Sequence, residues 1–275
     1  MTDALNTLGR PGSGMLAGRR ILVVGAGTQT SDDPGSPVGN GRAISILCGR
    51  EGAAVACLDR EAESAQATAG LVAAEHAQAV VVVADVSDAG QCSAAVATAA
   101  IELGGLDGLV LNVGIGRGSR LAETSAEDWD ATFAVNVRSH FLACQAALPL
   151  LAESAGTGSS AAIVFISSVA GLKPGSRVPA YDSSKAAIGG LCRHVAAEGA
   201  RKGVRANVIA PGLIDTPLGR VASAGRPSRD RTPVPLGRMG SAWEIAEAAV
   251  WLLSARASYV TGQVLAVDGG LSSLL

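Results

Sequence analysis

The sequence predicts a single-domain α/β fold, in which a doubly wound parallel sheet of about seven strands carries helices on both faces. Short apolar runs recur along the 275 residues, and Ala-rich stretches of helical length separate them. Hydrophobic residues make up 48% of the chain but aromatic residues only 3%. The core must therefore be built from Ala, Val, Leu and Ile, which suits close-packed layers of helices and sheet.

The predicted strands are apolar runs without alternating polar residues, as is typical of strands buried on both faces. They are expected at residues 20–24, 54–58, 79–84, 109–111, 161–166, 206–210 and 264–267. In such sheets ligands bind beyond the carboxyl ends of the strands. The first candidates for a site are therefore the residues that follow the strands, namely Gly25, Asp59, Asp85, Asn112, Ser167, Ser168, Pro211 and Gly212.

Composition argues against several classes of partner. The net charge of -2 gives no basic field for nucleic acid, and no apolar stretch reaches the length of a membrane span. The five cysteines are odd in number and lack C-x-x-C spacing, so we expect reduced core thiols, with neither disulfides nor a metal site. We expect a cytoplasmic protein with a flexible tail over residues 1–18 and one domain over residues 19–275.

A glycine-rich turn follows the first predicted strand. Gly25 and Gly27 come directly after it, and a helix is predicted to open at Gly39, Asn40 and Gly41. Glycines at a helix start let backbone N–H groups approach a pyrophosphate, because no Cβ stands in the way. Residues 28–38 form an insertion between the two groups. It is either a tolerated surface bulge or a segment that folds over the adenosine side of the cofactor.

Acidic residues follow the second and third predicted strands. The carboxylate of Asp59 can accept hydrogen bonds from an adenosine ribose and would repel a 2'-phosphate, which favours NAD over NADP; capping of the next helix is the alternative role. Arg60 either softens that preference or is solvated. Asp85 is expected to receive the adenine amino group or to cap a turn.

Tyr181 and Lys185 are expected to act together, because a spacing of four residues places them on one helix face. A free phenol has a pKa of about 10, and a neighbouring ammonium favours its ionised form. Tyr181 is therefore the predicted general acid/base. The hydroxyl of Ser168, rather than that of Ser167, is expected to bind the substrate oxygen.

With these residues the chain resembles the short-chain dehydrogenase/reductase family, in its compact Y-x-x-x-K type, from about Arg20 to Gly270. The matching motifs are the glycine turn, Asn112-Val113-Gly114, Asn136-Val137, Ile166-Ser167-Ser168, Tyr181 with Lys185, Pro211-Gly212 and Val267-Asp268-Gly269-Gly270. The chain departs from the family pattern in the insertion, in Asn40 where Ile is common, and in Val113 where Ala is usual.

The resemblance implies a Rossmann fold and an NAD(H)-dependent oxidoreductase that interconverts a secondary alcohol and a ketone, assembled as a homotetramer or dimer. It implies that Asn136 completes a catalytic tetrad with Ser168, Tyr181 and Lys185 by helping to hold a water that links Lys185 to solvent. The cofactor-binding residues it implies are Gly25, Gly39, Asn40, Gly41, Asp59, Arg60, Asp85, Val86, Asn112, Gly114, Tyr181, Lys185, Pro211, Gly212, Ile214 and Thr216.

The substrate is expected to be a small alcohol or ketone lying between Ser168, Tyr181 and the nicotinamide, with walls from residues 169–174, 115–117 and 213 onward. Residues at about 213–240 are rich in Gly, Pro and Arg and form either a mobile flap or an ungated surface loop. Two other functions stay open. Residues 236–240 resemble those of NADPH-dependent 3-oxoacyl thioester reductases, and a catalytically silent NAD-binding sensor or scaffold would share the fold.

Overall fold

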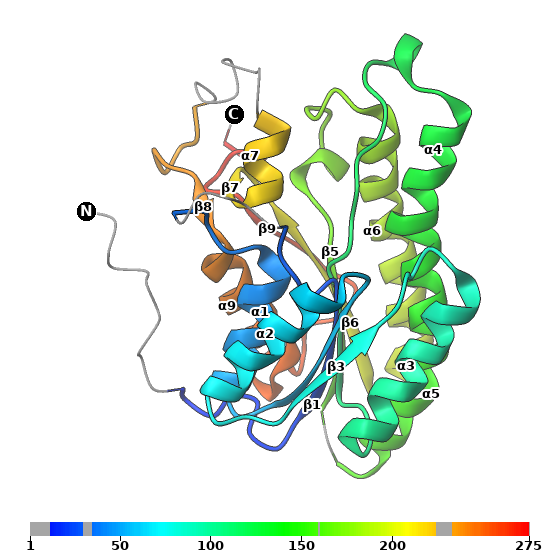
Figure 1. Ribbon diagram of the computed structural model, residues 1–275, viewed down its shortest axis with the longest axis vertical. Helices are drawn as coiled ribbons and strands as arrows, with labels where there is room; N and C mark the ends of the chain where they lie inside the picture. Colours follow the sequence, from blue (N-terminus) through cyan, green and yellow to red (C-terminus); the bar gives the residue numbers. More distant parts are fainter. Residues whose placement is uncertain (1–11, 30–34, 159, 224–232, 275) are drawn as a thin grey trace.

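The computed structural model of the chain describes residues 12–29, 35–158, 160–223 and 233–274. Its centre is a seven-stranded parallel sheet in the order β3-β2-β1-β4-β5-β6-β9 (Figure 1). The strands are β1 (Arg20–Val24), β2 (Ala54–Asp59), β3 (Ala79–Val83), β4 (Gly108–Leu111), β5 (Ala161–Ile166), β6 (Val204–Pro211) and β9 (Val264–Val267). The predicted doubly wound sheet is confirmed. Its winding reverses between β1 and β4, and this reversal fixes the place where a ligand site is expected.

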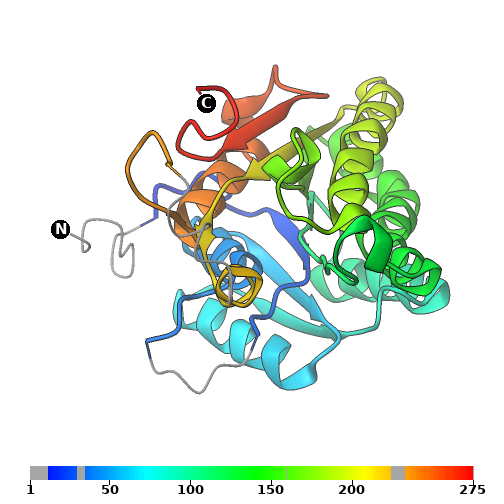
Figure 2. The same cartoon turned by 90° about the horizontal axis from the view of Figure 1, so that it is seen from above.

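Helices cover both faces of the sheet (Figures 1 and 2). On one face lie α1 (Asn40–Arg50), α2 (Ala62–Ala74) and α9 (Ala242–Leu253); on the other lie α3 (Ala89–Leu103), α5 (Ser139–Gly156) and α6 (Pro179–Ala200). Between α3 and α6 in sequence, α4 (Ala126–Phe133) precedes α5. None of the helices in the described part of the chain is long and apolar enough to cross a bilayer.

The two hydrophobic cores are built from alternate residues of the same strands. In β1, Ile21 and Val23 belong to the core under α1 and α9, while Leu22 and Val24 belong to the core under α3 and α5. All four side chains are almost completely buried. A strand whose every side chain is buried needs apolar residues throughout, which explains the unbroken apolar runs.

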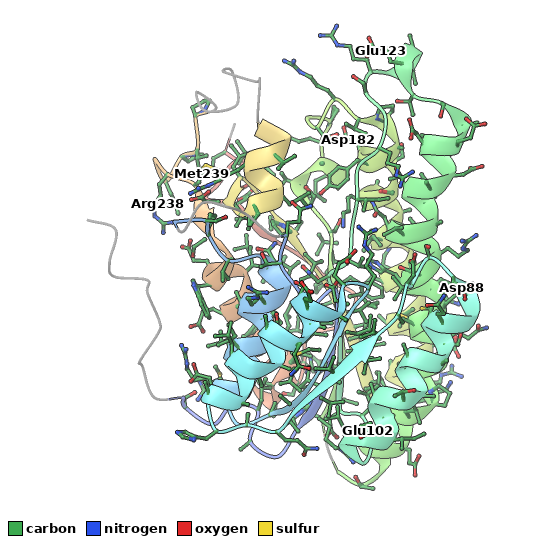
Figure 3. The ribbon with its side chains drawn as sticks, in the orientation of Figure 1. Asp88, Glu102, Glu123, Asp182, Arg238 and Met239 are labelled. Atoms are coloured by element: carbon green, nitrogen blue, oxygen red, sulfur yellow. The ribbon has the colours of Figure 1, made fainter. Side chains whose placement is uncertain are left out.

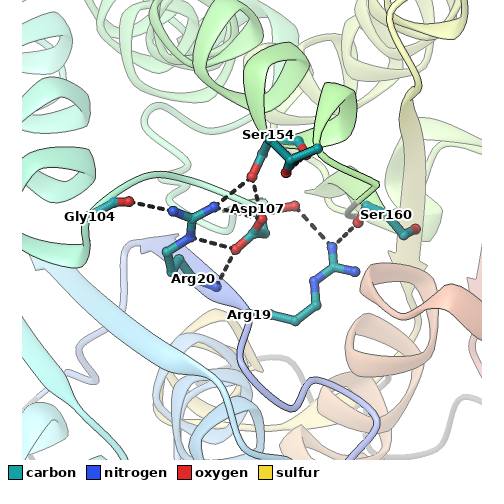
Figure 4. A network of polar contacts seen from close by, with 7 residues as sticks. Arg19, Arg20, Gly104, Asp107, Ser154 and Ser160 are labelled. Carbon is teal, nitrogen blue, oxygen red and sulfur yellow. Dashed lines mark hydrogen bonds and ion pairs between the residues drawn. The ribbon is translucent and has the colours of Figure 1, made fainter.

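A polar network ties the amino ends of β1 and β4 to α5 at the edge of the sheet away from the strand carboxyl ends (Figure 4). The guanidinium of Arg20 forms two bonds to the carboxylate of Asp107, at 2.7 and 3.0 Å. The hydroxyl of Ser154 also donates to Asp107, and Arg19 donates to the backbone carbonyls of Asp107 and Ser160. Because Asp107 is almost fully buried, this network fixes the starts of β1 and β4 to each other and to α5.

Two segments differ from the sequence prediction. The described part of the expected tail is anchored, because Ser13 and Met15 donate backbone hydrogen bonds to the carboxylate of Glu51 and Leu16 is fully buried. The described part of the expected flap contains the helix α7 (Pro217–Ser223), which begins at a proline and is capped by a hydrogen bond from the Gly219 N–H to Thr216 Oγ1. The rest of the tail, insertion and flap lies outside the described residues.

A second, two-stranded parallel sheet that sequence reasoning missed closes the base of the flap. It pairs β7 (Ile214–Asp215) with β8 (Gly240–Ser241). Two-residue strands carry no periodic pattern that a sequence could reveal. This pairing brings the two ends of the flap together beside α9.

Candidate active site

A cleft of about 290 Å³ opens at the carboxyl ends of the strands, where the winding of the sheet reverses. Most of the predicted cofactor-binding residues line it. These are Gly25, Gly39, Asn40, Gly41, Asp59, Arg60, Asp85, Val86, Asn112, Gly114, Tyr181, Lys185 and Thr216. The flap residue Met239 and Asp182, next to Tyr181 in the chain, lie at this end of the molecule in Figure 3.

Five predicted residues do not line the cleft: Ser168, Asn136, Pro211, Gly212 and Ile214. Asn136 lies behind it, as described below, and Ile214 pairs in the small sheet. Gly212 follows β6, and a Cβ there would come within 2.6 Å of Asp268. Gly212 therefore makes a close backbone contact with the C-terminal turn, and the direct cofactor contacts of Pro211, Gly212 and Ile214 stay predictions.

The glycine turn is held by close backbone contacts. Gly25 has a φ of 78°, and a Cβ on Gly41 would lie 1.8 Å from the carbonyl oxygen of Gly25. The side-chain amide of Asn112 donates to that same carbonyl at 2.8 Å. Gly39 is the N-cap of α1, and Gly39, Asn40 and Gly41 line the cleft, so this helix begins at the cleft edge. The contact of its N–H groups with a pyrophosphate stays a prediction.

Asp59 links the end of β2 to the glycine turn. Its carboxylate accepts the N–H of Gly27 at 2.9 Å and the N–H of Glu61 at 3.2 Å. A Cβ on Gly27 would lie 2.7 Å from this carboxylate, so only glycine fits. Arg42 lies close enough for the charge of Asp59 to raise the pKa of Arg42, although burial lowers that pKa more strongly.

The base of the insertion is closed by residues that sequence reasoning did not single out. Thr28 Oγ1 accepts the N–H of Gly39 at 3.0 Å, and Ser64 on α2 bonds both the N–H and the carbonyl of Thr28, at 2.9 and 3.0 Å. Thr28 and Gly39 thus lie side by side. A Thr and a Ser bracketing a glycine-rich segment were the available signal, but their pairing is not visible in the sequence.

The two remaining charged candidates, Asp85 and Arg60, interact with residues close to them in the sequence. Asp85 accepts the N–H of Ser87 at 2.9 Å, and hydrogen bonds from Ser87 lower the pKa of the Asp85 carboxyl. This is the turn-capping role foreseen for it, and Asp85 also lines the cleft. Arg60 is exposed and forms a 3.2 Å ion pair with Glu61.

Tyr181 and Lys185 lie one turn apart on α6, which starts at Pro179. The Lys185 ammonium is 5.7 Å from the centroid of the Tyr181 ring. Lys185 is buried, with only 4% of its surface exposed, and its Nζ donates to the Ile166 carbonyl at 3.0 Å. Burial lowers the pKa of Lys185 to about 8. The predicted phenol and ammonium are therefore brought together at the cleft.

The two serines after β5 have different roles. Ser167 Oγ donates to the Lys185 carbonyl at 2.7 Å and so fastens β5 to α6. Ser168 caps a short 3-10 turn, Val169–Gly171, by accepting the Ala170 N–H at 3.1 Å, and it is only partly buried. Ser167, and not Ser168, lines the cleft, so the choice of Ser168 for the substrate oxygen stays a prediction.

Asn136 lies in a π-helical turn, Ala134–Arg138, between α4 and α5. Its amide brackets Ile115, accepting the N–H and donating to the carbonyl, both at 2.8 Å. It also donates to Ser184 Oγ at 2.9 Å, and Ser184 donates to the Tyr181 carbonyl. Isolated π turns often mark functional sites; this one joins the loop after β4 to the start of α6.

Comparisons with known proteins point to one family. A family model described as enoyl-(acyl carrier protein) reductase matches residues 37–272. The chain is 38% identical over 247 residues to 2-(S)-hydroxypropyl-CoM dehydrogenase 3 of Xanthobacter autotrophicus, covering 87% of this chain and 95% of that protein. It is 40% identical over 231 residues to an inactive 2-(S)-hydroxypropyl-CoM dehydrogenase 2 of the same organism, covering 82% and 97%. A 3-oxoacyl-[acyl-carrier-protein] reductase of Chlamydia trachomatis is 33% identical, covering 94% and 100%.

Solved structures resemble the fold throughout. A short-chain dehydrogenase/reductase from Burkholderia xenovorans matches with a TM-score of 0.85 and 34% identity, covering 96% of this chain and 100% of that one. A 2-deoxy-D-gluconate 3-dehydrogenase from Agrobacterium tumefaciens with bound NADP matches at 0.80 and 36%, covering 93% and 97%. A 7α-hydroxysteroid dehydrogenase complexed with NADH matches at 0.83 and 30%, covering 93% and 94%. The chain is thus an oxidoreductase that acts on alcohols or ketones with a nicotinamide cofactor, and it belongs to the short-chain dehydrogenase/reductase family.

Proposed function

We propose that this protein is an NAD(H)-dependent oxidoreductase that interconverts a secondary alcohol and a ketone, with Tyr181 as general acid/base. The observation that carries the proposal is the buried ammonium of Lys185, 5.7 Å from the ring of Tyr181 at the edge of the cleft. The nicotinamide, when bound, supplies the hydride acceptor or donor. The protein itself must move the proton and hold the substrate oxygen.

In the oxidation direction Tyr181 accepts the proton of the substrate hydroxyl, and in reduction it returns one. The positive charge of Lys185 favours the phenolate. Ser168 orients the substrate oxygen by a hydrogen bond and stabilises the charge that develops on it. Asn136 fixes the backbone of Ile115 and, through Ser184, the first turn of α6.

The preference for NAD is proposed from Asp59. The relatives do not decide it, because solved structures of the family carry NADP in one case and NADH in another. A carboxylate held at the edge of the cleft by Gly27 repels a 2'-phosphate and can accept hydrogen bonds from a ribose. Arg42 weakens the repulsion without cancelling it, since it too is bound to neighbouring groups, Thr68 and Ser64.

The test is a screen of secondary alcohols with NAD and NADP, and of ketones with the reduced cofactors, with the Tyr181→Phe variant in parallel. Tyr259→Phe is the matched control, because Tyr259 is the other of the two tyrosines and is fully exposed. Turnover should be lost in the first variant and unchanged in the second. Full turnover by Tyr181→Phe refutes the assignment of Tyr181 as general acid/base. Inactivity of the wild-type protein on every compound favours a sensor or scaffold. That role is consistent with the similarity of the chain to a protein named inactive.

A second candidate activity is the reduction of a 3-oxoacyl thioester with NADPH. The similarity to a 3-oxoacyl-[acyl-carrier-protein] reductase over 94% of the chain favours it, and the charge of Asp59 opposes it. Adding a 3-oxoacyl thioester to the screen, with NADH and NADPH in separate wells, distinguishes the two. Faster turnover of the thioester with NADPH than of any alcohol with NAD would replace the first proposal with the second.

We also propose a homo-oligomer, a dimer or tetramer, in the cytoplasm. Apolar or aromatic side chains are exposed along the edge strand β9 and the turn before it, at Tyr259, Val264 and Leu265. All five cysteines are buried and unpaired, which fits a reducing compartment. Light scattering of the purified protein tests the assembly, and a monomer at micromolar concentration would refute it.

A further inference from the structure

Asn40, the first residue of α1, carries a buried polar atom that has no partner in the protein. Its side-chain oxygen, Oδ1, is shut off from solvent and accepts no hydrogen bond from any residue that the structure describes. The nitrogen of the same amide, Nδ2, is not shut off in this way. Leaving a buried oxygen unpartnered is costly to a folded protein, so an exception of this kind calls for an explanation.

The place of Asn40 in the fold suggests one. The residue lines the cleft. A side chain at the first position of a helix leans back past the helix start, because every Cα–Cβ bond of a helix tilts toward its amino end. The amide of Asn40 is therefore carried toward the same region of the cleft as the N–H groups that open α1.

The backbone on either side of Asn40 is fixed. The N–H of Gly39 donates to Thr28 Oγ1 at 3.0 Å. On the other side, a Cβ on Gly41 would lie 1.8 Å from the carbonyl oxygen of Gly25, so the start of α1 is packed directly against the glycine turn. The amide of Asn40 thus meets a ligand from a set position.

The order of the strands indicates which part of a dinucleotide meets Asn40. Asp59 ends β2 on one side of the cleft, and Lys185 is bonded to the end of β5 on the other. The glycine turn follows β1, which lies between those two strands. A nicotinamide dinucleotide that extends from Asp59 to Lys185 therefore has its middle, the pyrophosphate, at the glycine turn and the start of α1.

The chemistry of a pyrophosphate matches this corner of the cleft. Its charged oxygens accept hydrogen bonds, and the amide of Asn40 has two N–H donors on Nδ2. The first turn of α1 adds unpaired backbone N–H groups and the positive end of the helix dipole, and it contains no acidic residue. An amide whose Oδ1 is turned into the protein presents Nδ2 to such a ligand.

We propose that Nδ2 of Asn40 donates a hydrogen bond to the pyrophosphate of the bound cofactor, in addition to the backbone N–H groups of α1. The unpartnered Oδ1 is the cost of this orientation, so Asn40 destabilises the free protein while it tightens the cofactor. The inference deepens the proposed cofactor site and rests on its place in the cleft. It depends neither on Tyr181 nor on the choice between NAD and NADP, because both cofactors carry the pyrophosphate.

Two substitutions of similar size separate the two ends of this amide. Asn40→Leu keeps the branched shape and removes both polar atoms, whereas Asn40→Asp keeps Oδ1 and replaces the donor with a charged acceptor. Each protein is titrated calorimetrically with NAD, with ADP-ribose, which lacks the nicotinamide, and with ADP, which also lacks the second ribose. The Tm of each unliganded protein is measured in parallel.

The matched control is Ser45→Ala on the same helix. Ser45 Oγ donates to the Gly41 carbonyl at 2.8 Å, and Ser45 is fully buried away from the cleft. The control therefore loosens the first turns of α1 without removing a group that a ligand could reach. It should lower the Tm and leave all three Kd values unchanged.

Asn40→Leu should weaken NAD, ADP-ribose and ADP about tenfold each, the size expected for one lost hydrogen bond to a charged group. Asn40→Asp should weaken all three further, because its carboxylate repels the phosphates. The Tm of unliganded Asn40→Leu should nevertheless rise by about 2 °C or more, because the unpartnered buried oxygen is gone. Weaker binding together with a more stable free protein is a result that a merely structural role would not give.

Several results would overturn the inference. If Asn40→Leu weakens NAD but not ADP, the partner of the amide is the nicotinamide or its ribose. Asn40→Asp binding as tightly as wild type would show that Oδ1 is the contact atom, and a lower Tm in Asn40→Leu would mean that the helix start had loosened. A wild-type protein that binds neither NAD nor NADP also removes the site. If Tyr181→Phe keeps full turnover while the Asn40 variants bind ADP more weakly, the proposed chemistry fails and the contact of Asn40 stands.

Discussion

Asn in place of Asp59 is the substitution that most sharply tests how the cleft chooses its cofactor. The amide of Asp59→Asn keeps an oxygen that can accept the Gly27 N–H, which Asp59 accepts at 2.9 Å. It removes the negative charge alone. Asp59→Ala, by contrast, removes both the charge and the tie to the glycine turn. Comparing the two variants separates charge repulsion from the shape of the turn.

The magnitude follows from the position of the carboxylate. Two unit charges about 4 Å apart interact by about 1 kcal/mol in water and about 4 kcal/mol near a protein surface. Asp59 is only partly buried, and the charge of Arg42 acts on the same region, so the lower half of that range applies. A repulsion of about 1.5–2 kcal/mol corresponds to a factor of about 10 to 30 in the ratio of the Kd for NADP to the Kd for NAD.

Calorimetric titration of the two oxidised cofactors measures this ratio directly. Asp59→Asn should reduce it about 10- to 30-fold, mainly by tightening NADP, while Asp59→Ala should weaken both cofactors as well. Asp85→Asn is the control, because Asp85 also lines the cleft but is bonded to Ser87; it should leave the ratio unchanged. An unchanged ratio in Asp59→Asn would show that the charge of this residue does not select the cofactor.

Three further outcomes are expected. Holding Lys185 charged inside the fold at pH 7, with a pKa of about 8 against an ordinary 10.5, costs about 3 kcal/mol. Lys185→Met should therefore raise the free energy of unfolding by about 1–3 kcal/mol. The same variant should abolish turnover. The gain in stability should be constant below pH 8 and shrink as the pH rises toward 10.5, and denaturant titrations showing a loss of stability at pH 7 would contradict it. Asp107→Asn should destabilise the fold by about 3 kcal/mol by leaving Arg20 without its carboxylate but leave the Kd for NAD unchanged, since the network lies away from the cleft; a weaker Kd would mean that the two edges are coupled. Gly41→Ala places a Cβ 1.8 Å from the carbonyl oxygen of Gly25, so NAD binding should weaken about tenfold or more, and a calorimetric Kd equal to that of the wild type would refute the close contact.

The strands and the pairing of Tyr181 with Lys185 on one helix face could be predicted because their signals are short-range. A run such as Ile21–Val24 must be apolar throughout when both faces of the strand are covered, and Tyr181 and Lys185 face the same way because of the helical repeat. The order of the sheet then follows from the right-handed connections between successive parallel strands. The sequence therefore predicts where the cleft lies.

What could not be predicted depends on contacts between distant residues. The tie between Asp107 and Arg20 spans 87 positions, and that between Ser64 and Thr28 spans 36. The π turn around Asn136 has no sequence signature that separates it from an ordinary helix. The anchoring of residues 13–16 by Glu51 was missed for the same reason, because Gly and Pro nearby indicated a loose tail and gave no hint of the carboxylate that holds it.

The bond between Thr28 and Gly39 gives the segment between them an unusual independence. Its two ends meet at one point on the rim of the cleft, so its sequence can change while the glycine turn and α1 keep their positions. The segment is therefore a natural place for relatives to diverge in length, and a practical one at which to graft a peptide tag or a fluorescent reporter. Tyr181 lies on a different helix, α6, and would not be displaced by such an exchange.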